Sequence, residues 1–101
     1  MDVAGRVVLI TGASSGVGAA LAEQLAGMGA RVVVNYSRSA DAADAVVSRI
    51  TSAGGEALAV QADVSEEADC KRLVGATIEQ FGQLDVLVLS LIHISEPTRP
   101  Y

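Results

Sequence analysis

The chain has 101 residues, enough for one domain or part of one, and half of these residues are apolar while 19% are charged. Its net charge of −5 argues against nucleic acid as a partner, because binding to a phosphate backbone requires a basic surface. Cys70 and His93 are the only residues of their types, so the chain alone forms no disulfide and no cysteine or histidine metal cluster.

The sequence begins without a basic segment followed by a long apolar run, and no apolar stretch is long enough to cross a bilayer. We therefore expect a cytoplasmic protein that binds neither membranes nor nucleic acid.

The first part of the chain predicts a strand, a helix and a second strand. Residues 6–11 form a short apolar run, which is typical of a parallel strand buried on both faces. Apolar residues then recur at helical spacing over residues 16–28, and Gly29 predicts a left-handed stop before a strand at residues 30–36. The predicted buried stripe of the helix consists of Val17, Leu21, Leu25 and Met28.

A second helix and a third strand follow. Ser39 is a predicted helix cap with Asp41 in the first turn, where a carboxylate interacts well with the helix dipole, and Gly54 ends this helix. Its predicted buried stripe is Ala43, Val46, Val47 and Ile50. Residues 56–63 predict the third strand.

The last predicted elements are a third helix, capped by Ser65 and stopped by Gly82, and a fourth strand at residues 84–88. The predicted buried stripe of this helix is Cys70, Leu73, Val74, Thr77, Ile78 and Phe81, and in it Cys70 is a core residue rather than a nucleophile. The alternation predicts an α/β fold, a parallel sheet with helices on both faces. The arrangement expected for it is that of a Rossmann-type doubly wound sheet in the order 3-2-1-4, truncated after the fourth strand.

Residues 89–101 depart from this pattern, because they contain no helix cap, no apolar stripe and no glycine turn. Residues 89–99 resemble the translation of a transposon adapter used in preparing sequencing libraries. We therefore expect a dinucleotide-binding part at residues 1–88 and a non-native or unstructured tail at residues 89–101.

The motif with the clearest chemistry is Thr-Gly-x-x-x-Gly-x-Gly at residues 11–18, between the first strand and the first helix. Gly12 is suited to the turn, Gly16 to close approach of the backbone to a pyrophosphate, and Gly18 to close packing of the helix. The amino end of a helix favours an anion. Such a loop can also merely join a strand to a helix, but the surrounding elements are those of a dinucleotide fold. No Gly-Lys-Ser/Thr follows, which excludes a P-loop.

This spacing resembles that of the short-chain dehydrogenase/reductase family, and the stretches 35–39, 62–64 and 84–88 agree with the resemblance. Within the family, the stretch 32–65 is most similar to the 3-oxoacyl-carrier-protein reductase branch, with sugar and alcohol dehydrogenases close behind.

The end of the second strand lacks the acidic residue that NAD-preferring folds usually place there. Arg38 and Ser39 are suited to a 2′-phosphate, so NADP is the expected cofactor rather than NAD, although Arg38 is alternatively a solvated surface residue. The resemblance implies that Asp63 and Val64 hold the adenine, whereas Asp63 is alternatively a turn residue beside Ser65. The full predicted cofactor site is Gly12, Ser14, Ser15, Gly16, Val17, Gly18, Asn35, Tyr36, Arg38, Ser39, Asp63 and Val64.

The family resemblance also implies catalytic residues that this chain lacks. The family uses a serine and a tyrosine four residues before a lysine, but the only lysine is Lys71 and residue 67 is not tyrosine. The family's Asn-Asn-Ala-Gly stretch after the fourth strand and the helices through which relatives form homo-oligomers are absent too. The resemblance implies an oxidoreductase whose intact form transfers hydride between NADP(H) and a carbonyl or secondary alcohol, such as a 3-oxoacyl thioester. The alternatives are a non-catalytic nucleotide-binding fragment and a truncated product without activity.

Overall fold

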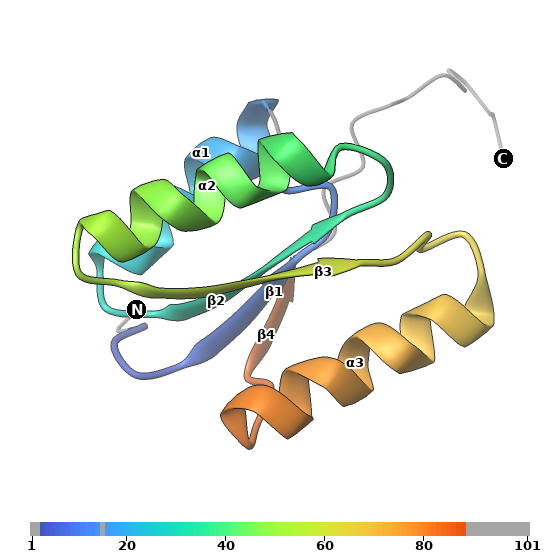
Figure 1. The fold of residues 1–101 in the computed structure, drawn as a ribbon. Coiled ribbons are helices and arrows are strands. Elements are labelled where there is room, and N and C mark those ends of the chain that lie inside the picture. Colours follow the sequence, from blue (N-terminus) through green and yellow to red (C-terminus); the bar gives the residue numbers. More distant parts are fainter. Residues whose placement is uncertain (1–2, 15, 89–101) are drawn as a thin grey trace, which may run out of the picture.

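Strands and helices alternate along the chain in a computed structural model that describes residues 3–14 and 16–88 (Figure 1). The elements are β1 (Val7–Ile10), α1 (Gly16–Gly27), β2 (Arg31–Tyr36), α2 (Ala40–Ser52), β3 (Glu56–Gln61), α3 (Glu67–Phe81) and β4 (Val86–Val88). This order confirms the predicted succession of elements. The predictions for the tail at residues 89–101 lie outside the described residues.

The four strands form one parallel sheet in the order β3-β2-β1-β4, as predicted. Ile10 at the end of β1 is in register with Val34 of β2 on one side and Val88 of β4 on the other. The carboxyl ends of the strands therefore lie at one edge of the sheet, and the segments that leave them are brought together there.

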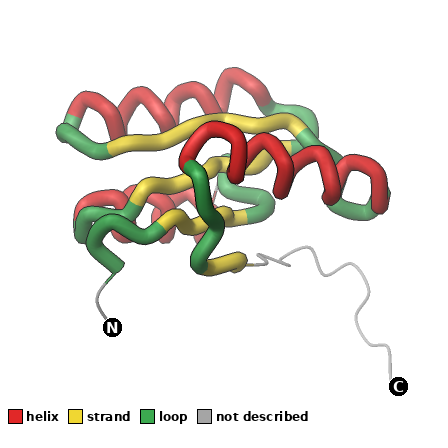
Figure 2. The backbone as a smooth tube through the Cα atoms, turned by 90° about the horizontal axis from the view of Figure 1, so that it is seen from below, coloured by secondary structure: helices red, strands yellow, loops and turns green. Residues whose placement is uncertain are grey.

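Helices cover both faces of the sheet, with α1 and α2 on one face and α3 on the other (Figures 1 and 2). Val32 and Val34 of β2 belong to the core cluster under α1 and α2, whereas Val33 packs with Leu73 of α3. Successive side chains of a strand point to opposite faces, so a strand covered on both sides is apolar throughout. This explains the continuous apolar runs of β1 and β2.

Helix α1 packs chiefly through its smallest residues, and of the predicted stripe only Leu21 and Leu25 contact the core, as half-buried side chains. Its buried residues are Gly18, Ala19, Ala22 and Ala26. Val17 is 74% exposed and Met28 is 51% exposed, so their assignment to the core was wrong. Nearly every side of α1 is apolar, so periodicity leaves the buried face undetermined, and close approach to the sheet selects alanine and glycine.

The helix boundaries also differ in detail from the prediction. Ser39 is the N-cap residue of α2, but its side chain makes no capping hydrogen bond, and its carbonyl oxygen accepts one from the amide of Ala43. Ser65 does not cap α3, because its hydroxyl donates to Asp63 and Glu66 is the N-cap residue.

The predicted stripe of α3 was right for most of its length. Leu73 and Thr77 are buried, and Cys70, Val74 and Phe81 are half-buried. Ile78 is an error in that stripe, since 47% of its surface is exposed.

Strand β4 is tied to β1 by a carboxylate as well as by the ladder. The amide of Val7 donates to Asp85 Oδ2 over 2.8 Å, and the amide of Asp85 donates to the carbonyl oxygen of Val7 over 3.0 Å. The hydrogen bond from Val7, followed by one from the side chain of Gln83, lowers the pKa of Asp85. These bonds hold β4 beside β1 as the outermost strand of the sheet.

Candidate functional site

The carboxyl edge of the sheet is where open α/β sheets bind ligands. Three segments leave it within the described residues: the loop 11–14, the turn 37–39 and the segment 62–66 (Figure 1). Ser15 lies outside the described residues, and every other predicted cofactor residue lies in these segments, in the first turn of α1 or at the end of β2.

The glycine loop has a backbone that requires glycine at two positions. Gly12 has a φ of +63° and Gly16 a φ of +62°, in the left-handed region that residues with a side chain rarely adopt. Helix α1 begins at Gly16, and both Gly16 and Val17 are exposed. The amino end of α1 is therefore open on the side of the loop, where its unpaired amide groups favour an anion.

Gly18 is required for a different reason. A β-carbon at this position would lie 2.6 Å from the carbonyl oxygen of Gly12 and 3.0 Å from the α-carbon of Ala13. Both neighbours are backbone atoms, which cannot rotate away. The absence of a side chain thus lets the first turn of α1 press directly against the glycine loop.

Asn35 lies beneath the glycine loop at the end of β2. Its Oδ1 accepts a hydrogen bond from the amide of Gly12 over 3.2 Å. Its Nδ2 donates to the carbonyl oxygens of Val60 and Ala62, over 3.3 and 3.2 Å, and more distantly to that of Tyr36. Only 2% of the surface of Asn35 is exposed, so this side chain joins three backbone segments inside the protein.

The turn after β2 carries the residues predicted to recognise a 2′-phosphate. Arg38 and Ser39 are both exposed, and Tyr36 just before them is half-buried. The turn is held against β3, because Gln61 Nε2 donates to the carbonyl oxygen of Ser37 over 3.1 Å. An exposed guanidinium group therefore stands at the carboxyl edge on a fixed backbone.

Asp63 forms the turn between β3 and α3. Its Oδ1 accepts hydrogen bonds from the hydroxyl of Ser65 over 2.6 Å and from the amide of Ser65 over 3.0 Å. These two bonds, with a smaller contribution from the charge of Arg38, lower the pKa of Asp63. Asp63 is thus an ionised turn residue whose side chain lies near enough to Arg38 to interact with it electrostatically.

An apolar hollow adjoins this turn on the α3 face of the sheet. It lies between β1, β4 and α3, and Val64 and Leu87 contribute partly exposed side chains to its wall. Cys70 also lines the hollow, and its thiol donates to the carbonyl oxygen of Val64 over 3.2 Å. The half-buried thiol of Cys70 is therefore held by a local hydrogen bond.

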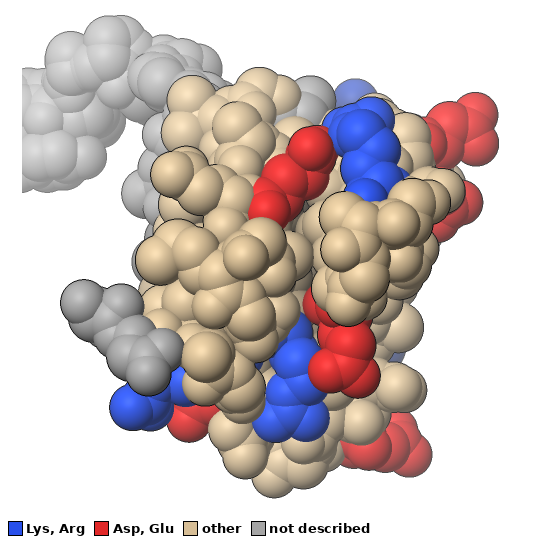
Figure 3. All heavy atoms as spheres, turned by 90° about the vertical axis from the view of Figure 1, so that its left-hand side faces the viewer, with Lys and Arg blue, Asp and Glu red and all other residues tan. Residues whose placement is uncertain are grey.

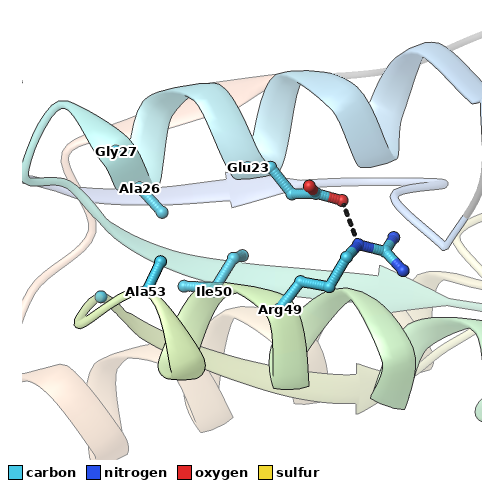
Figure 4. A pocket seen from close by; sticks show the side chains of 7 residues that line it. Glu23, Ala26, Gly27, Arg49, Ile50 and Ala53 are labelled. Carbon is cyan, nitrogen blue, oxygen red and sulfur yellow. Dashed lines mark hydrogen bonds and ion pairs between the residues drawn. The ribbon is translucent and has the colours of Figure 1, made fainter.

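A second hollow lies at the opposite end of the molecule, between the carboxyl ends of α1 and α2. Acidic and basic side chains are interspersed over this end of the surface (Figure 3). Arg49 Nε of α2 contacts Glu23 Oε2 of α1 over 2.8 Å, beside Ala26 and Ile50, which also line the hollow (Figure 4). The hollow is lined by the carboxyl half of α1 from Glu23 onward, whereas the glycine loop meets α1 at Gly16, so the two do not form one site.

Groups for acid–base or metal chemistry are sparse in this part of the protein. Lys71 is exposed on α3 and pairs with Glu67 one turn earlier, over 3.7 Å. Across residues 3–14 and 16–88, no group of three or more His, Cys, Asp or Glu side chains could hold a metal ion. None of the helices in these ranges has the length and apolar character needed to cross a membrane.

One polar residue inside an apolar strand is the sequence signal for the hydrogen-bonded centre of this edge. An amide at position 35 follows three valines in a buried strand, and a buried polar side chain needs partners inside the protein. That signal pointed to Asn35, but only the spatial neighbours identify Gly12, Val60 and Ala62 as its partners. No feature of the sequence predicts the hydrogen bond from Gln61 to Ser37.

Comparisons with known proteins agree with this geometry. The chain is 60% identical over 84 residues to an uncharacterized oxidoreductase of Methylorubrum extorquens, an alignment that covers 83% of the chain and 34% of that relative. It is 51% identical over 83 residues to a 3-oxoacyl-[acyl-carrier-protein] reductase of Synechocystis, covering 82% of the chain and 34% of that relative.

A solved short-chain dehydrogenase from Burkholderia cenocepacia, in complex with NADP, superimposes with a TM-score of 0.81 at 41% identity. The match covers 86% of our chain and 36% of that one. The chain thus spans about a third of the length of these proteins. The model of the short chain dehydrogenase family matches residues 6–91. The glycine loop, the sheet order and these matches together show that the chain belongs to the short-chain dehydrogenase family.

Proposed function

We propose that the carboxyl edge of this sheet binds NADP. The observation that carries the proposal is the glycine loop, in which Gly12 and Gly16 have left-handed backbones and Gly18 admits no side chain. These constraints hold the amino end of α1 open at the edge of the sheet, where a pyrophosphate would be favoured by the helix dipole and by unpaired amides. The NADP complex of the Burkholderia cenocepacia relative supports the choice of cofactor.

In the proposed complex, each segment at the carboxyl edge binds a different part of NADP. The pyrophosphate lies against Ser14, Ser15 and the first turn of α1 from Gly16 to Gly18. Arg38 and Ser39 bind the 2′-phosphate, beside Tyr36, because guanidinium and phosphate form charge-assisted hydrogen bonds.

Asp63 and Val64 hold the adenine ring. Since the bonds from Ser65 fall on Oδ1, the second carboxylate oxygen of Asp63 is the proposed acceptor for the exocyclic amine of adenine.

We further propose that the intact protein transfers hydride between NADP(H) and a carbonyl or secondary alcohol, with a 3-oxoacyl thioester as the first candidate substrate. The Synechocystis relative, named as a 3-oxoacyl-[acyl-carrier-protein] reductase, supports this substrate class. Bound NADPH would supply the hydride, and the residues of this chain would bind and orient it. No tyrosine stands four residues before Lys71, so we expect the 101-residue chain to bind NADP without turnover.

A titration with NADP and NAD tests the cofactor assignment. Replacing Arg38 by glutamine removes a charge-assisted bond to the 2′-phosphate, a loss of about 1.5–3 kcal/mol. The affinity for NADP should therefore fall about ten- to hundredfold, while the affinity for NAD changes less than about twofold. Isothermal titration calorimetry measures both.

The matched control is Arg49→Gln, which removes an exposed arginine of α2 whose partner is Glu23 at the far end of α1. It should leave both affinities unchanged. Equal affinities of the unmodified chain for NADP and NAD would contradict the role of Arg38, and absence of binding to either nucleotide would contradict the proposed site.

The division between residues 1–88 and 89–101 is a separate proposal. We infer that the natural sequence diverges after Val88, because residues 89–99 resemble translated adapter DNA. Amplifying and resequencing the coding region downstream of the Val88 codon tests this. An Asn-Asn-Ala-Gly continuation with a Tyr-x-x-x-Lys pair would support the reductase, and recovery of the same tail would refute the adapter origin.

A further inference from the structure

A single buried amide connects the two loops that form the proposed nucleotide site. Asn35 ends the run of valines in β2, and its side chain is enclosed by protein. Since 98% of its surface is covered, Asn35 has almost no surface to offer to a nucleotide. Any influence of this residue on binding must therefore pass through the backbone groups that it contacts.

We propose that Asn35 is a positioning residue that fixes the glycine loop through Gly12 and aligns it with the carboxyl end of β3. The inference rests on the proposed NADP site and assigns to Asn35 an indirect role in it.

The contacts of Asn35 reach both sides of the edge. The amide of Gly12 donates to Oδ1 over 3.2 Å, and the amide of Ala13 donates to the backbone carbonyl oxygen of Asn35 over 2.9 Å. Two successive amides of the glycine loop are thus held by one residue. On the other side, Nδ2 donates to the carbonyl oxygen of Ala62, the residue before Asp63.

The chemistry of this position requires an amide. Gly12 presents an N–H group and needs an acceptor, whereas Val60 and Ala62 present carbonyl oxygens and need a donor. An asparagine side chain provides both on one planar group, an ionised aspartate provides acceptors only, and leucine provides neither. Of these three side chains, asparagine alone satisfies both sides.

The two loops depend on Asn35 to different degrees. Without the side chain, each loop keeps one backbone bond over 2.9 Å, from the amide of Ala62 to the carbonyl oxygen of Tyr36 on the β3 side and from the amide of Ala13 to the carbonyl oxygen of Asn35 in the glycine loop. The difference lies in the group that loses its partner, which in the glycine loop is a backbone amide and after β3 is a pair of carbonyl oxygens. In the glycine loop, the amide that donates to Asn35 Oδ1 belongs to Gly12, which has a left-handed backbone. The carbonyl oxygen of Gly12 lies against Gly18 in the first turn of α1, so a shift of Gly12 would also be felt there. Removal of the amide should therefore disturb the pyrophosphate side of the site more than the adenine side.

The test compares two ligands and one local probe in the 101-residue chain. The variant Asn35→Leu keeps the approximate size of the side chain and removes its hydrogen bonds. In the folded variant, the affinity for NADP should fall at least tenfold, whereas the affinity for 2′-AMP, which has no pyrophosphate, should fall less than threefold. Amide hydrogen exchange measured by NMR should show loss of protection at Gly12. A general loss of stability would lower the affinities for NADP and 2′-AMP by similar factors, so a difference between the two losses points to the glycine loop.

The matched control is Thr77→Val, which removes a buried hydroxyl that donates to the carbonyl oxygen of Leu73 within α3. It should leave both affinities and the exchange at Gly12 unchanged. A second variant, Asn35→Asp, keeps the acceptor for Gly12, so protection at Gly12 should lie between that of the unmodified chain and that of Asn35→Leu. This variant serves as the test where Asn35→Leu does not fold.

Unchanged NADP affinity together with unchanged exchange at Gly12 in a folded Asn35 variant would overturn the inference. Equal losses for NADP and 2′-AMP would also overturn it, since they would place the effect outside the glycine loop. If the unmodified chain binds no NADP, the proposed function fails, and the exchange at Gly12 in the free protein still decides whether Asn35 holds the loop.

Discussion

The two faces of the sheet are built from the same strands but are covered very differently. Under α1 and α2, a cluster of thirteen buried apolar residues runs across β1 and β2, whereas the cluster under α3 contains four. In β4, Val86 and Val88 pack against the larger cluster, while Leu87 on the other face is 50% exposed. Within the described residues, most of the buried apolar core thus lies on one face, while the other face is covered over Leu9 of β1 and Val33 of β2 but leaves Leu87 of β4 half-exposed.

The largest effect is expected where the well-covered face meets the glycine loop. The change Gly18→Ala places a β-carbon 2.6 Å from the carbonyl oxygen of Gly12, so α1 and the loop must move apart. Overpacking of this kind costs about 1–3 kcal/mol of unfolding free energy. It should also abolish measurable NADP binding. Urea denaturation monitored by circular dichroism, followed by calorimetric titration, measures both effects.

A glycine at the other end of the same helix provides the control. A β-carbon at Gly27 would meet no atom within 4 Å, and this residue has no left-handed backbone. The change Gly27→Ala should therefore leave stability unchanged or raise it by at most about 1 kcal/mol. A similar response of Gly18→Ala would mean that the loop tolerates displacement of α1.

An intermediate effect is expected from neighbouring valines of β2 that point to opposite faces. Val32 and Val33 are both completely buried, but Val32 lies under α1 and α2 and Val33 under α3. The change Val32→Ala should cost about 2–3 kcal/mol, from lost burial and an unfilled cavity. The change Val33→Ala should cost at least about 0.5 kcal/mol less, because a single helix on an otherwise open face can shift to close the cavity.

The two valine variants act as controls for each other, since the substitution and the strand are the same. Their unfolding free energies, from urea curves with equal slopes, give the comparison directly. A larger loss of unfolding free energy in Val33→Ala than in Val32→Ala would show that the smaller cluster contributes more stability per residue than the larger one.

The smallest effect on stability is expected at the uncovered part of the α3 face. Leu87 is half-exposed, so Leu87→Gln should change the unfolding free energy by no more than about 0.5 kcal/mol. It should nevertheless reduce self-association measured by sedimentation velocity, because exposed apolar surface beside an open sheet edge promotes contacts between molecules.

Ile78 is exposed to a similar extent but lies on α3 outside the apolar hollow, which makes Ile78→Gln the matched variant. It should reduce self-association less than Leu87→Gln does. Equal reductions would indicate that general surface hydrophobicity, rather than the hollow, drives association.

The sequence by itself determined the order of elements and the topology of the sheet. Runs of apolar residues such as the valines of β2 mark buried strands, and glycines such as Gly29 and Gly82 end helices with left-handed backbones. With a glycine loop after the first strand, this succession indicates the strand order of a dinucleotide fold. It also located the glycine loop, because Gly12 and Gly16 are needed for local backbone reasons that depend little on distant residues.

Tertiary structure decided which side of each element is buried and what the polar groups contact. Hydrophobicity favoured Val17 and Met28 as core residues of α1, but the fully buried positions of this helix are taken by alanine and glycine, with Leu21 and Leu25 half-buried beside them. The hydroxyl of Ser65 donates a hydrogen bond to Asp63 and does not cap α3. The partners of Asn35 are as much as 27 residues away along the chain, and side-chain hydrogen bonds over such separations are fixed by how the strands pack, which no local pattern contains.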